Sequence, residues 1–399
     1  MNIVIISSGI LPNPAIRGGA VETLTDILID YNEKYNKDNI TLYSIYDDDA
    51  EKISTKYKYT KIKYIKISTV IKKMSRYIFY ILNKIPNNYF GNVFIRKVIK
   101  EIGYEDEIDL VIVENICEFG LILNKITEKP LILHLHNDYL YKGSRLAQKI
   151  CNSYKSIITV SDFISRRVST IEGNINTDII TVYNGIDNLK FNNSLYANER
   201  IEIRRKYGIN ENDRVIIFSG RLIKEKGIEE LLEAFTRMPY DESIKLVIVG
   251  SSVFEGAKKT KFVKRLEKIA LKRKEQIIFT GYIRYEEMPK IYSIADIGVI
   301  PSTWDEPFGL TLIEQMSTGL PVIVSDSGAM TEIVNYSCGI IVNRDNEFID
   351  ELKRSMIYLL KEEQVRKEMG INAKLRAEEF SQYKYCKNFF EAIKKYYHQ

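Results

Sequence analysis

Two sets of short apolar runs constrain the fold of this chain more than any other feature of its sequence. The runs alternate with segments of helical periodicity along all 399 residues. Short buried strands that alternate with helices are typical of parallel sheets covered by helices. The first set comprises residues 2–7, 39–45, 110–115, 130–136, 156–161 and 179–184, and the second set comprises residues 215–220, 245–250, 276–281, 297–302, 321–326 and 338–343. About six strands in each set are enough for two doubly wound α/β domains.

A turn near the middle of the chain marks the boundary between the two sets. It reads Asn-Gly-Ile-Asp at residues 184–187 and is followed by a polar stretch with few strand formers at 188–209. We therefore predict an N-terminal domain over residues 1–188, a C-terminal domain over 189–382 and a final amphipathic helix within 383–399. Two such domains that face one another form a cleft at the carboxyl ends of their sheets, where these folds bind ligands.

The segment at residues 301–332 joins a predicted strand to a helix that begins near Gly309. Glu306 lies in the approach to this helix, and Glu314 lies about one and a half turns into it. The open amides at a helix N-terminus favour an anion such as a phosphate. An ionised carboxylate only accepts hydrogen bonds, so Glu314 suits a diol such as a ribose. This one segment could therefore hold both the phosphates and the sugar of a nucleotide.

A second loop of the same domain carries two cations between a strand and a helix. Arg221 and Lys226 flank the turn, Gly220 allows a close approach of the backbone, and Gly227 leads into the helix. Two fixed cations would neutralise a leaving diphosphate, the arginine as a planar fork and the lysine as a point charge. Either cation alone would be interpreted as an exposed loop residue, but both together beside 301–332 indicate a phosphate site.

The N-terminal domain has a weaker candidate of the same kind. Gly18 and Gly19 follow the first predicted strand, and paired glycines at such a turn can let backbone amides reach a phosphate. Alone the pair is an ordinary turn, and it is not the dinucleotide-binding fingerprint because no G-x-G-x-x-G follows the strand.

His134 and His136 alternate along one predicted strand, so they share a face and could form a metal-binding pair. The only other histidine of the chain is His398, which leaves too few ligands for a histidine-rich site. We therefore predict no metal site. We expect His136, at the carboxyl end of the strand, to line a cleft, and His134 to be packed.

Residues 51–100 are strongly basic. Thirteen Lys or Arg against one Glu give this stretch a charge of +12, so the remainder of the chain sums to −7 within the total of +5. Aromatic residues are interleaved with the lysines. One interpretation is a solvated face in a chain biased toward Ile, Lys, Asn and Tyr; the other is a surface that meets anionic lipid. No nucleic-acid-binding module accompanies the charge.

Composition favours a reduced, cytoplasmic protein. The four cysteines are scattered without C-x-x-C spacing, which is typical of buried thiols rather than of disulfides or zinc ligands. No apolar stretch approaches the ~18 residues of a spanning helix, and we interpret the apolar start as a buried strand rather than a signal peptide. The expected location is cytoplasmic, with peripheral attachment to the inner face of the plasma membrane if the basic stretch meets lipid.

Seven short motifs occur in a particular order along the chain. They are GGAVET at 18–23, LHND at 135–138, YNGID at 183–187, GRLIKEKG at 220–227, YSIADIGVIPS at 292–302, EPFGLTLIEQMSTGLPVI at 306–323 and SGAMTEI at 327–333. In this order the sequence resembles the large family 4 of retaining glycosyltransferases, within the group 1 glycosyl transferases. The resemblance implies the GT-B fold, in which two Rossmann-like doubly wound domains face each other across a cleft.

The resemblance also implies roles for individual residues. By position, Arg221 and Lys226 correspond to the residues that bind the donor diphosphate. Glu314 corresponds to the residue that holds the ribose hydroxyls, and Glu306 to the one that contacts the transferred sugar. His136 matches a histidine that lines the donor sugar. Glu306, His136, Lys226 and Arg221 are thus the implied catalytic residues.

Further donor contacts are implied for main-chain groups. Amides near Phe308, Gly309 and Leu310 would face the sugar and phosphates. Gly18 and Gly19 would approach the phosphates from the N-terminal domain. The last helix is expected to cross back onto that domain.

The expected function is transfer of a sugar, with retention, from a nucleotide-diphosphate donor to an acceptor hydroxyl. Cell-surface polysaccharide or glycolipid synthesis on a lipid-linked or glycan acceptor is the expected setting. No metal or other cofactor is expected, since cations of the chain can stabilise the leaving group. Two alternatives remain: a nucleotide-sugar 2-epimerase of the same fold, and a non-catalytic protein that binds nucleotide sugars.

Overall fold

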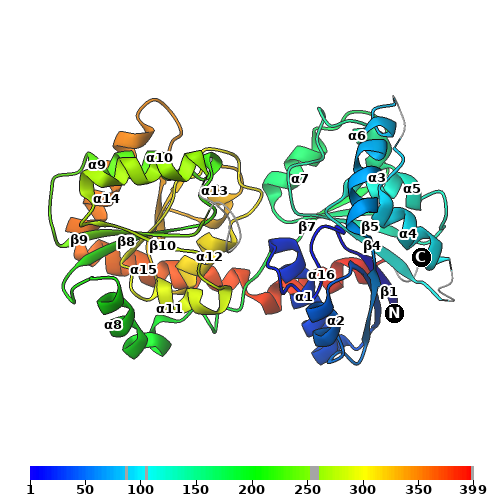
Figure 1. Ribbon diagram of the computed structural model, residues 1–399, viewed down its shortest axis with the longest axis horizontal. Helices are drawn as coiled ribbons and strands as arrows, with labels where there is room; N and C mark the ends of the chain where they lie inside the picture. Colours follow the sequence, from blue (N-terminus) through cyan, green and yellow to red (C-terminus); the bar gives the residue numbers. More distant parts are fainter. Residues whose placement is uncertain (86–88, 104–106, 252–259, 397–399) are drawn as a thin grey trace. The chain divides into compact units, whose positions relative to one another are not determined.

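The computed structural model describes residues 1–85, 89–103, 107–251 and 260–396. It divides into two compact units (Figure 1). The first unit comprises Met1–Gly185 with Gln382–Gln399, and the second comprises Ile186–Ser381. Each unit is built on one parallel sheet covered by helices, which confirms the predicted class of two Rossmann-like α/β domains.

The first unit contains a seven-stranded parallel sheet in the order β3-β2-β1-β4-β5-β6-β7. Its strands are β1 (Asn2–Ile6), β2 (Asn39–Ile45), β3 (Thr60–Ile65), β4 (Leu110–Glu114), β5 (Leu131–Leu135), β6 (Ser156–Thr159) and β7 (Asp178–Thr181). Its helices are α1 (Ala20–Tyr31), α2 (Asp48–Ser54), α3 (Thr69–Leu82), α4 (Val93–Ile102), α5 (Gly120–Leu123), α6 (Ala147–Cys151), α7 (Asp162–Ser169) and α16 (Gln382–Lys394). Figure 1 shows α1 and α16 on one side of this sheet and α4 and α5 on the other.

The central strands of this sheet are buried along their whole length because both faces are covered. Every residue of β4 and β5 is buried, as expected for strands that lie between two helical layers. β3 was not predicted, and it is the edge strand of the sheet. Its sequence TKIKYI alternates lysine with apolar residues, a pattern that protects an edge from pairing with another chain. That alternation could have identified β3 as a strand. It was not recognised because lysine is abundant throughout residues 51–100.

The second unit contains a six-stranded parallel sheet in the order β10-β9-β8-β11-β12-β13. Its strands are β8 (Arg214–Ser219), β9 (Ile244–Val249), β10 (Ile277–Gly281), β11 (Ile297–Ile300), β12 (Val322–Ser325) and β13 (Gly339–Val342). Its helices are α8 (Ala197–Lys206), α9 (Ile228–Thr236), α10 (Lys261–Ala270), α11 (Met288–Tyr292), α12 (Leu310–Ser317), α13 (Met330–Ile333), α14 (Phe348–Lys361) and α15 (Glu363–Ala377). The main core of this unit lies between the sheet and helices α9, α10 and α14, and Figure 1 shows α8 and α11 on the opposite face.

The C-terminal helix α16 belongs to the first unit. It packs on α1, where the ring of Phe390 stacks on that of Tyr31 with 5.8 Å between centroids. The predicted end of this helix, in residues 397–399 with His398, lies outside the described residues. Within the described part of the chain, no helix combines the length and the apolar character needed to cross a bilayer.

Candidate active site

The predicted donor-binding loops of the second unit meet at the switch point of its sheet. β8 and β11 are hydrogen-bonded neighbours that are distant in sequence, so the loops that leave their carboxyl ends diverge to opposite faces. Such a point is where open α/β sheets bind ligands. The loop after β8 carries Arg221 and Lys226, and the loop after β11 carries Glu306.

A close backbone contact fixes these two loops against each other. Gly227 has a φ of +66°, and a Cβ atom there would lie 1.7 Å from the carbonyl oxygen of Pro301. The amide of Thr303 also donates a hydrogen bond to the carbonyl of Glu225 at 2.9 Å. Only glycine satisfies both the left-handed backbone and the contact. The sequence thus holds the lysine loop directly beside the strand end that leads to Glu306.

Lys226 and Glu306 are paired in the structure. The Nζ atom of Lys226 donates to Oε1 of Glu306 at 2.6 Å, and Oγ of Ser302 donates to the same oxygen at 2.5 Å. The Glu306 side chain is 7% exposed and that of Lys226 is 23% exposed. The lysine is therefore the accessible partner of the pair, and an anionic ligand would compete with Glu306 for its charge.

Helix α12 presents its N-terminus at the same place. It begins at Leu310 after Gly309, and no side chain caps it. Its first amides are therefore available to a ligand, as predicted for an anion site. Phe308, just before the helix, is buried and lies edge-on to Phe380 with 6.0 Å between ring centroids. This ring fixes the backbone that leads into the helix.

Glu314 lies in the second turn of α12 and is buried. Burial raises the pKa of its carboxyl to about 7, although a hydrogen bond from the Tyr292 hydroxyl, at 2.8 Å, favours the ionised form. The same hydroxyl lies 2.7 Å from Oγ of Ser219, which accepts from Nε2 of Gln315 at 3.1 Å. Gln315, Ser219 and Tyr292 thus form a hydrogen-bonded chain. At its end, the hydroxyl of Tyr292 donates to the carboxylate. Sequence reasoning missed this support, although Tyr292 begins one of the quoted motifs.

Arg221 lies at the carboxyl end of β8 and its side chain is exposed. Within the parts of the chain that the structure describes, no carboxylate forms an ion pair with it. The structure therefore joins Lys226 to Glu306 and leaves Arg221 as a separate cation at the same sheet edge.

Gly18 and Gly19 precede α1 in the first unit, with φ values of +74° and +105°. A Cβ atom on Gly19 would lie 2.2 Å from Oε2 of Glu22. Glu22 is buried, and Oγ of Ser8 donates to its carboxylate at 3.0 Å. Burial raises the pKa of Glu22, and the carboxylate of Glu114 acts in the same direction. The glycine loop thus encloses a buried carboxyl group that sequence reasoning did not identify.

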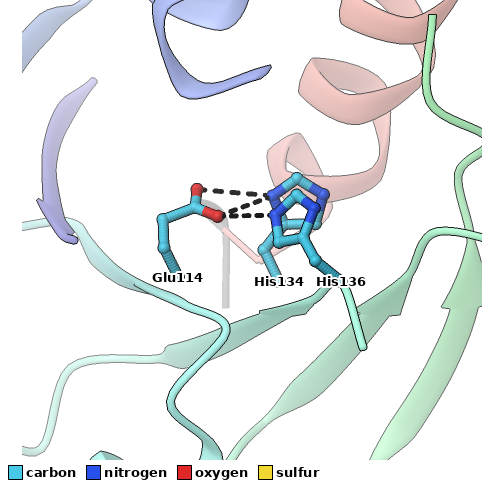
Figure 2. Close-up of side chains that lie close together, drawn as sticks. All are labelled: Glu114, His134 and His136. Carbon is cyan, nitrogen blue, oxygen red and sulfur yellow. Dashed lines mark hydrogen bonds and ion pairs between the residues drawn. The ribbon is translucent and has the colours of Figure 1, made fainter. Parts of the chain in front are cut away.

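His134 and His136 share one carboxylate (Figure 2). Oε2 of Glu114 lies 3.1 Å from Nδ1 of His134 and 2.9 Å from Nε2 of His136. Glu114 lies on β4, His134 lies on the adjacent strand β5, and His136 directly follows the end of β5; all three are buried. Glu114 was not predicted, because its partners are set by the register of strands that are about 20 residues apart in sequence. Donor atoms of all three residues lie within 4.8 Å of one another, as a metal site would require.

Comparisons with known proteins agree with this architecture. Residues 199–376 match the family model of glycosyl transferases group 1. Spore coat protein SA of Bacillus subtilis is 26% identical over 387 residues, which are 95% of this chain and 95% of that protein. An uncharacterized glycosyltransferase of Methanocaldococcus jannaschii is 30% identical over 230 residues, which span 54% of this chain and 57% of that protein. The crystal structure of Anabaena HepE in complex with UDP-glucose has a TM-score of 0.76 at 19% identity and covers 99% of this chain and 100% of that chain.

Proposed function

We propose that this chain moves a sugar from a nucleotide-diphosphate donor to an acceptor hydroxyl with retention at the anomeric carbon. The match of residues 199–376 to the model of glycosyl transferases group 1 supports a glycosyltransferase, and the donor class and the stereochemistry are what we add. The Lys226–Glu306 pair beside the uncapped start of α12 carries the proposal. It combines a movable cation, a carboxylate and open amides at the switch point of one sheet.

In this proposal each donor group has a partner of matching chemistry. Lys226 and Arg221 stabilise the diphosphate, and the amides at Gly309 and Leu310, at the start of α12, add to the positive potential. Glu314, when ionised, accepts from the two ribose hydroxyls. Glu306 contacts the transferred sugar once Lys226 turns to the phosphates. By their match to the family motifs, we propose that His136 contacts the sugar and that the Gly18–Gly19 loop contacts the phosphates.

The reaction then depends mainly on stabilisation of the leaving group. Negative charge grows on the departing diphosphate, and prepositioned cations and amides stabilise it more than they stabilise the bound donor. The same phosphate helps to deprotonate the acceptor on the face from which it leaves, which gives retention. Arg221 and Lys226 can supply the positive charge that this step needs, so we propose that it uses no metal cofactor.

The similar structures indicate only which nucleotide sugar to test first as the donor. Anabaena HepE was crystallised with UDP-glucose, so a UDP-sugar is the first donor to test. GDP-, ADP- and dTDP-sugars complete the panel, because Glu314 and the cations would contact parts that all of these donors share.

We also propose that the enzyme attaches peripherally to an anionic membrane and builds a cell-surface glycan or glycolipid. Helix α3 carries this proposal because its apolar side chains are exposed. Met74 is 65% exposed and Tyr77 is 69% exposed, and Val70, Ile78 and Tyr80 are exposed as well. The helix lies within the basic stretch 51–100. Apolar residues set among basic ones are typical of helices that lie in a lipid interface.

Replacement of the paired residues tests the proposed chemistry. We expect Lys226→Ala and Glu306→Ala each to lower turnover of the correct nucleotide sugar by about 10²- to 10³-fold, the usual effect of removing one group that stabilises the transition state. Release of the nucleoside diphosphate with a membrane extract as acceptor source is the measurement. Lys224→Ala is the matched control, since Lys224 is an exposed lysine of the same short helix. Full activity in both variants would refute the site, and epimerised donor without transfer would favour the 2-epimerase.

A further inference from the structure

Glu114, His134 and His136 form a hydrogen-bonded cluster at the carboxyl ends of two neighbouring strands. Glu114 is the last residue of β4 and is the register partner of His134 on β5. His136 follows two residues later on the same face, and Figure 2 shows both imidazoles turned toward the one carboxylate. The exposed fractions are 1% for Glu114, 0% for His134 and 7% for His136. The cluster is therefore shielded from water and held by the sheet.

The main chain around Asn115 fixes the geometry of the cluster. The amide of Asn115 donates to the carbonyl of His134 at 2.8 Å, and its side-chain oxygen accepts from the amide of His136 at 3.1 Å. Asn115 has a φ of +63°, a conformation that asparagine tolerates better than most residues. Both strand ends are thus tied together directly beside Glu114. These bonds hold the backbone positions from which the carboxylate and the two rings extend.

The protonation state of the cluster follows from its burial and contacts. Burial disfavours the ionised form of Glu114, but the two imidazoles outweigh it and lower the pKa of the carboxyl to about 2. Burial lowers the pKa of His136 to about 4, and His134 acts in the same direction while Glu114 opposes it. Near neutral pH Glu114 is therefore an anion and His136 is neutral.

These states determine which nitrogen of His136 carries its proton. An ionised carboxylate only accepts hydrogen bonds, so the nitrogen that faces it must be the donor. Nε2 of His136 faces Glu114 at 2.9 Å, and in a neutral ring this leaves Nδ1 as a bare acceptor. Nδ1 is buried and has no hydrogen-bond partner among the described residues. A buried acceptor without a partner destabilises the protein, and a ligand hydroxyl would supply the missing hydrogen bond.

We propose that Glu114 is a positioning residue that holds His136 in its Nε2–H form, so that Nδ1 accepts a hydrogen bond from a hydroxyl of the sugar substrate. The proposal rests on the proposed function for the identity of the ligand, but not for the tautomer. His136 then selects a sugar with a hydroxyl at that position, because a deoxy sugar leaves the buried nitrogen unsatisfied. Glu114 acts only through the ring, as a carboxylate that orients an imidazole.

A metal ion is the competing explanation, since two imidazoles and a carboxylate are ligands that zinc accepts. A metal-bound histidine almost always donates its second ring N–H to an acceptor. Nε2 of His134 and Nδ1 of His136 are the second nitrogens here, and within the described part of the chain neither has an acceptor. The distances of 2.9 and 3.1 Å are also those of ordinary hydrogen bonds. The geometry therefore favours the hydrogen-bonded cluster over a metal site.

Nitrogen NMR of the histidine rings tests the tautomer directly, because the sequence of 399 residues contains only three histidines. Long-range ¹H–¹⁵N correlation at pH 7, assigned with His134→Asn and His398→Asn variants, should show His136 protonated at Nε2 and bare at Nδ1. In Glu114→Gln the side-chain amide can donate to Nε2, so the Nδ1–H form should gain population. A bare Nε2 in the wild type, or an unchanged pattern in Glu114→Gln, would overturn the proposal. The proposal would also be overturned by a spectrum that changes on addition of one equivalent of Zn²⁺ and reverts to the original spectrum on addition of EDTA.

Kinetics separate positioning from mere packing. Glu114→Gln should lower kcat by about tenfold or more with little change in the donor KM, and Glu114→Asp should restore part of it. Glu118→Gln, which alters a carboxylate four residues further along, is the control with unchanged kcat. Unchanged kcat in Glu114→Gln would overturn the positioning role. A wild type that binds no nucleotide sugar would overturn the proposed function and the hydroxyl contact, while the NMR result would still report on Glu114 alone.

Discussion

Ionisation of Glu314 lowers the stability of the fold but is required for the binding role that we propose for this residue. Its carboxyl has a pKa of about 7 in the folded chain against 4.5 for an ordinary glutamate, because burial disfavours its charge. Between these two values the folded state binds the additional proton, so stability falls as the pH rises from about 4.5 to 7. The ionised form, which the proposed contact with ribose hydroxyls requires, is thus the form that the fold tolerates least.

Glu314→Gln should therefore stabilise the unliganded protein above pH 7. The gain is on the order of 3 kcal/mol at most, and it should vanish near pH 4.5, where wild-type Glu314 is protonated as well. Thermal unfolding of both proteins at pH 5 and pH 8 is the measurement, with the exposed Glu286 replaced by Gln as control. A Glu314→Gln protein that is less stable at pH 8 would show that the carboxylate serves the fold instead.

The same substitution should weaken donor binding, because glutamine offers one acceptor oxygen where an ionised carboxylate offers two. We expect a loss of about 10- to 100-fold in donor affinity at pH 8. For the wild type, donor affinity should rise between pH 6 and pH 8 as Glu314 ionises. Calorimetric titration at these two pH values checks both statements; affinity that is independent of pH in the wild type would exclude an ionising Glu314.

At the scale of residues, sequence reasoning found the groups with ligand chemistry but not their partners. Glu306 and Lys226 stood out through their motifs, and the structure places them 2.6 Å apart. Glu114 and Tyr292 were missed because their roles depend on strand register and on packing between distant segments. A buried tyrosine or glutamate has no local periodicity that distinguishes a support residue from a core residue.

At the scale of elements, the conformation of the loop between β8 and α9 depends on Gly227. Gly227→Ala should cost about 3 kcal/mol or more, because the added Cβ would overlap the carbonyl of Pro301 in addition to straining the backbone. Gly281→Ala is the matched control, since Gly281 has a φ of +76° but open space around it, and it should cost only about 1 kcal/mol. Urea denaturation measures both; equal losses would mean that the contact with Pro301 has no energetic importance.

Helix α3 is the element that links the chain to a membrane in our proposal. Met74→Asp with Tyr77→Asp should abolish sedimentation with vesicles that contain phosphatidylglycerol, because both exposed side chains would otherwise enter the interface. Tyr336→Asp, at an exposed tyrosine of the second unit, should leave sedimentation unchanged. Equal binding of the α3 double variant, or no binding by the wild type at low salt, would contradict the membrane role.

The elements themselves were largely predictable. The twelve apolar runs all became strands, since strands of a parallel sheet covered by helices are predominantly apolar. The thirteenth strand, β3, was missed because an edge strand rich in lysine has the composition of a surface loop. The start of α12 was predicted at Gly309 and is observed at Leu310, with Gly309 as its N-cap. Glycine before an apolar helical pattern was sufficient to place that boundary.

At the scale of the whole chain, the two sheets follow the same pattern of strand order. Each sheet therefore has a set of loops at the carboxyl ends of its strands. The second unit places Lys226, Glu306 and the start of α12 at the switch point of its sheet, and backbone contacts hold the loops after β8 and β11 together. The sequence predicted this architecture because alternation of strands and helices is a property of the entire chain. The identity of the sugar and of the acceptor depends on side chains in individual loops, for which a single sequence contains no periodic signal.

The central claim is that the chain binds a nucleotide-diphosphate sugar through Lys226 and its neighbours. A thermal-shift screen of the full-length protein against UDP-, GDP-, ADP- and dTDP-sugars tests it most directly, since a ligand that binds only the folded state raises its apparent stability. We predict that one donor class raises the unfolding temperature of the wild type and that Lys226→Ala removes most of this shift. No shift with any donor at millimolar concentration, or the same shift in Lys226→Ala, would contradict the claim.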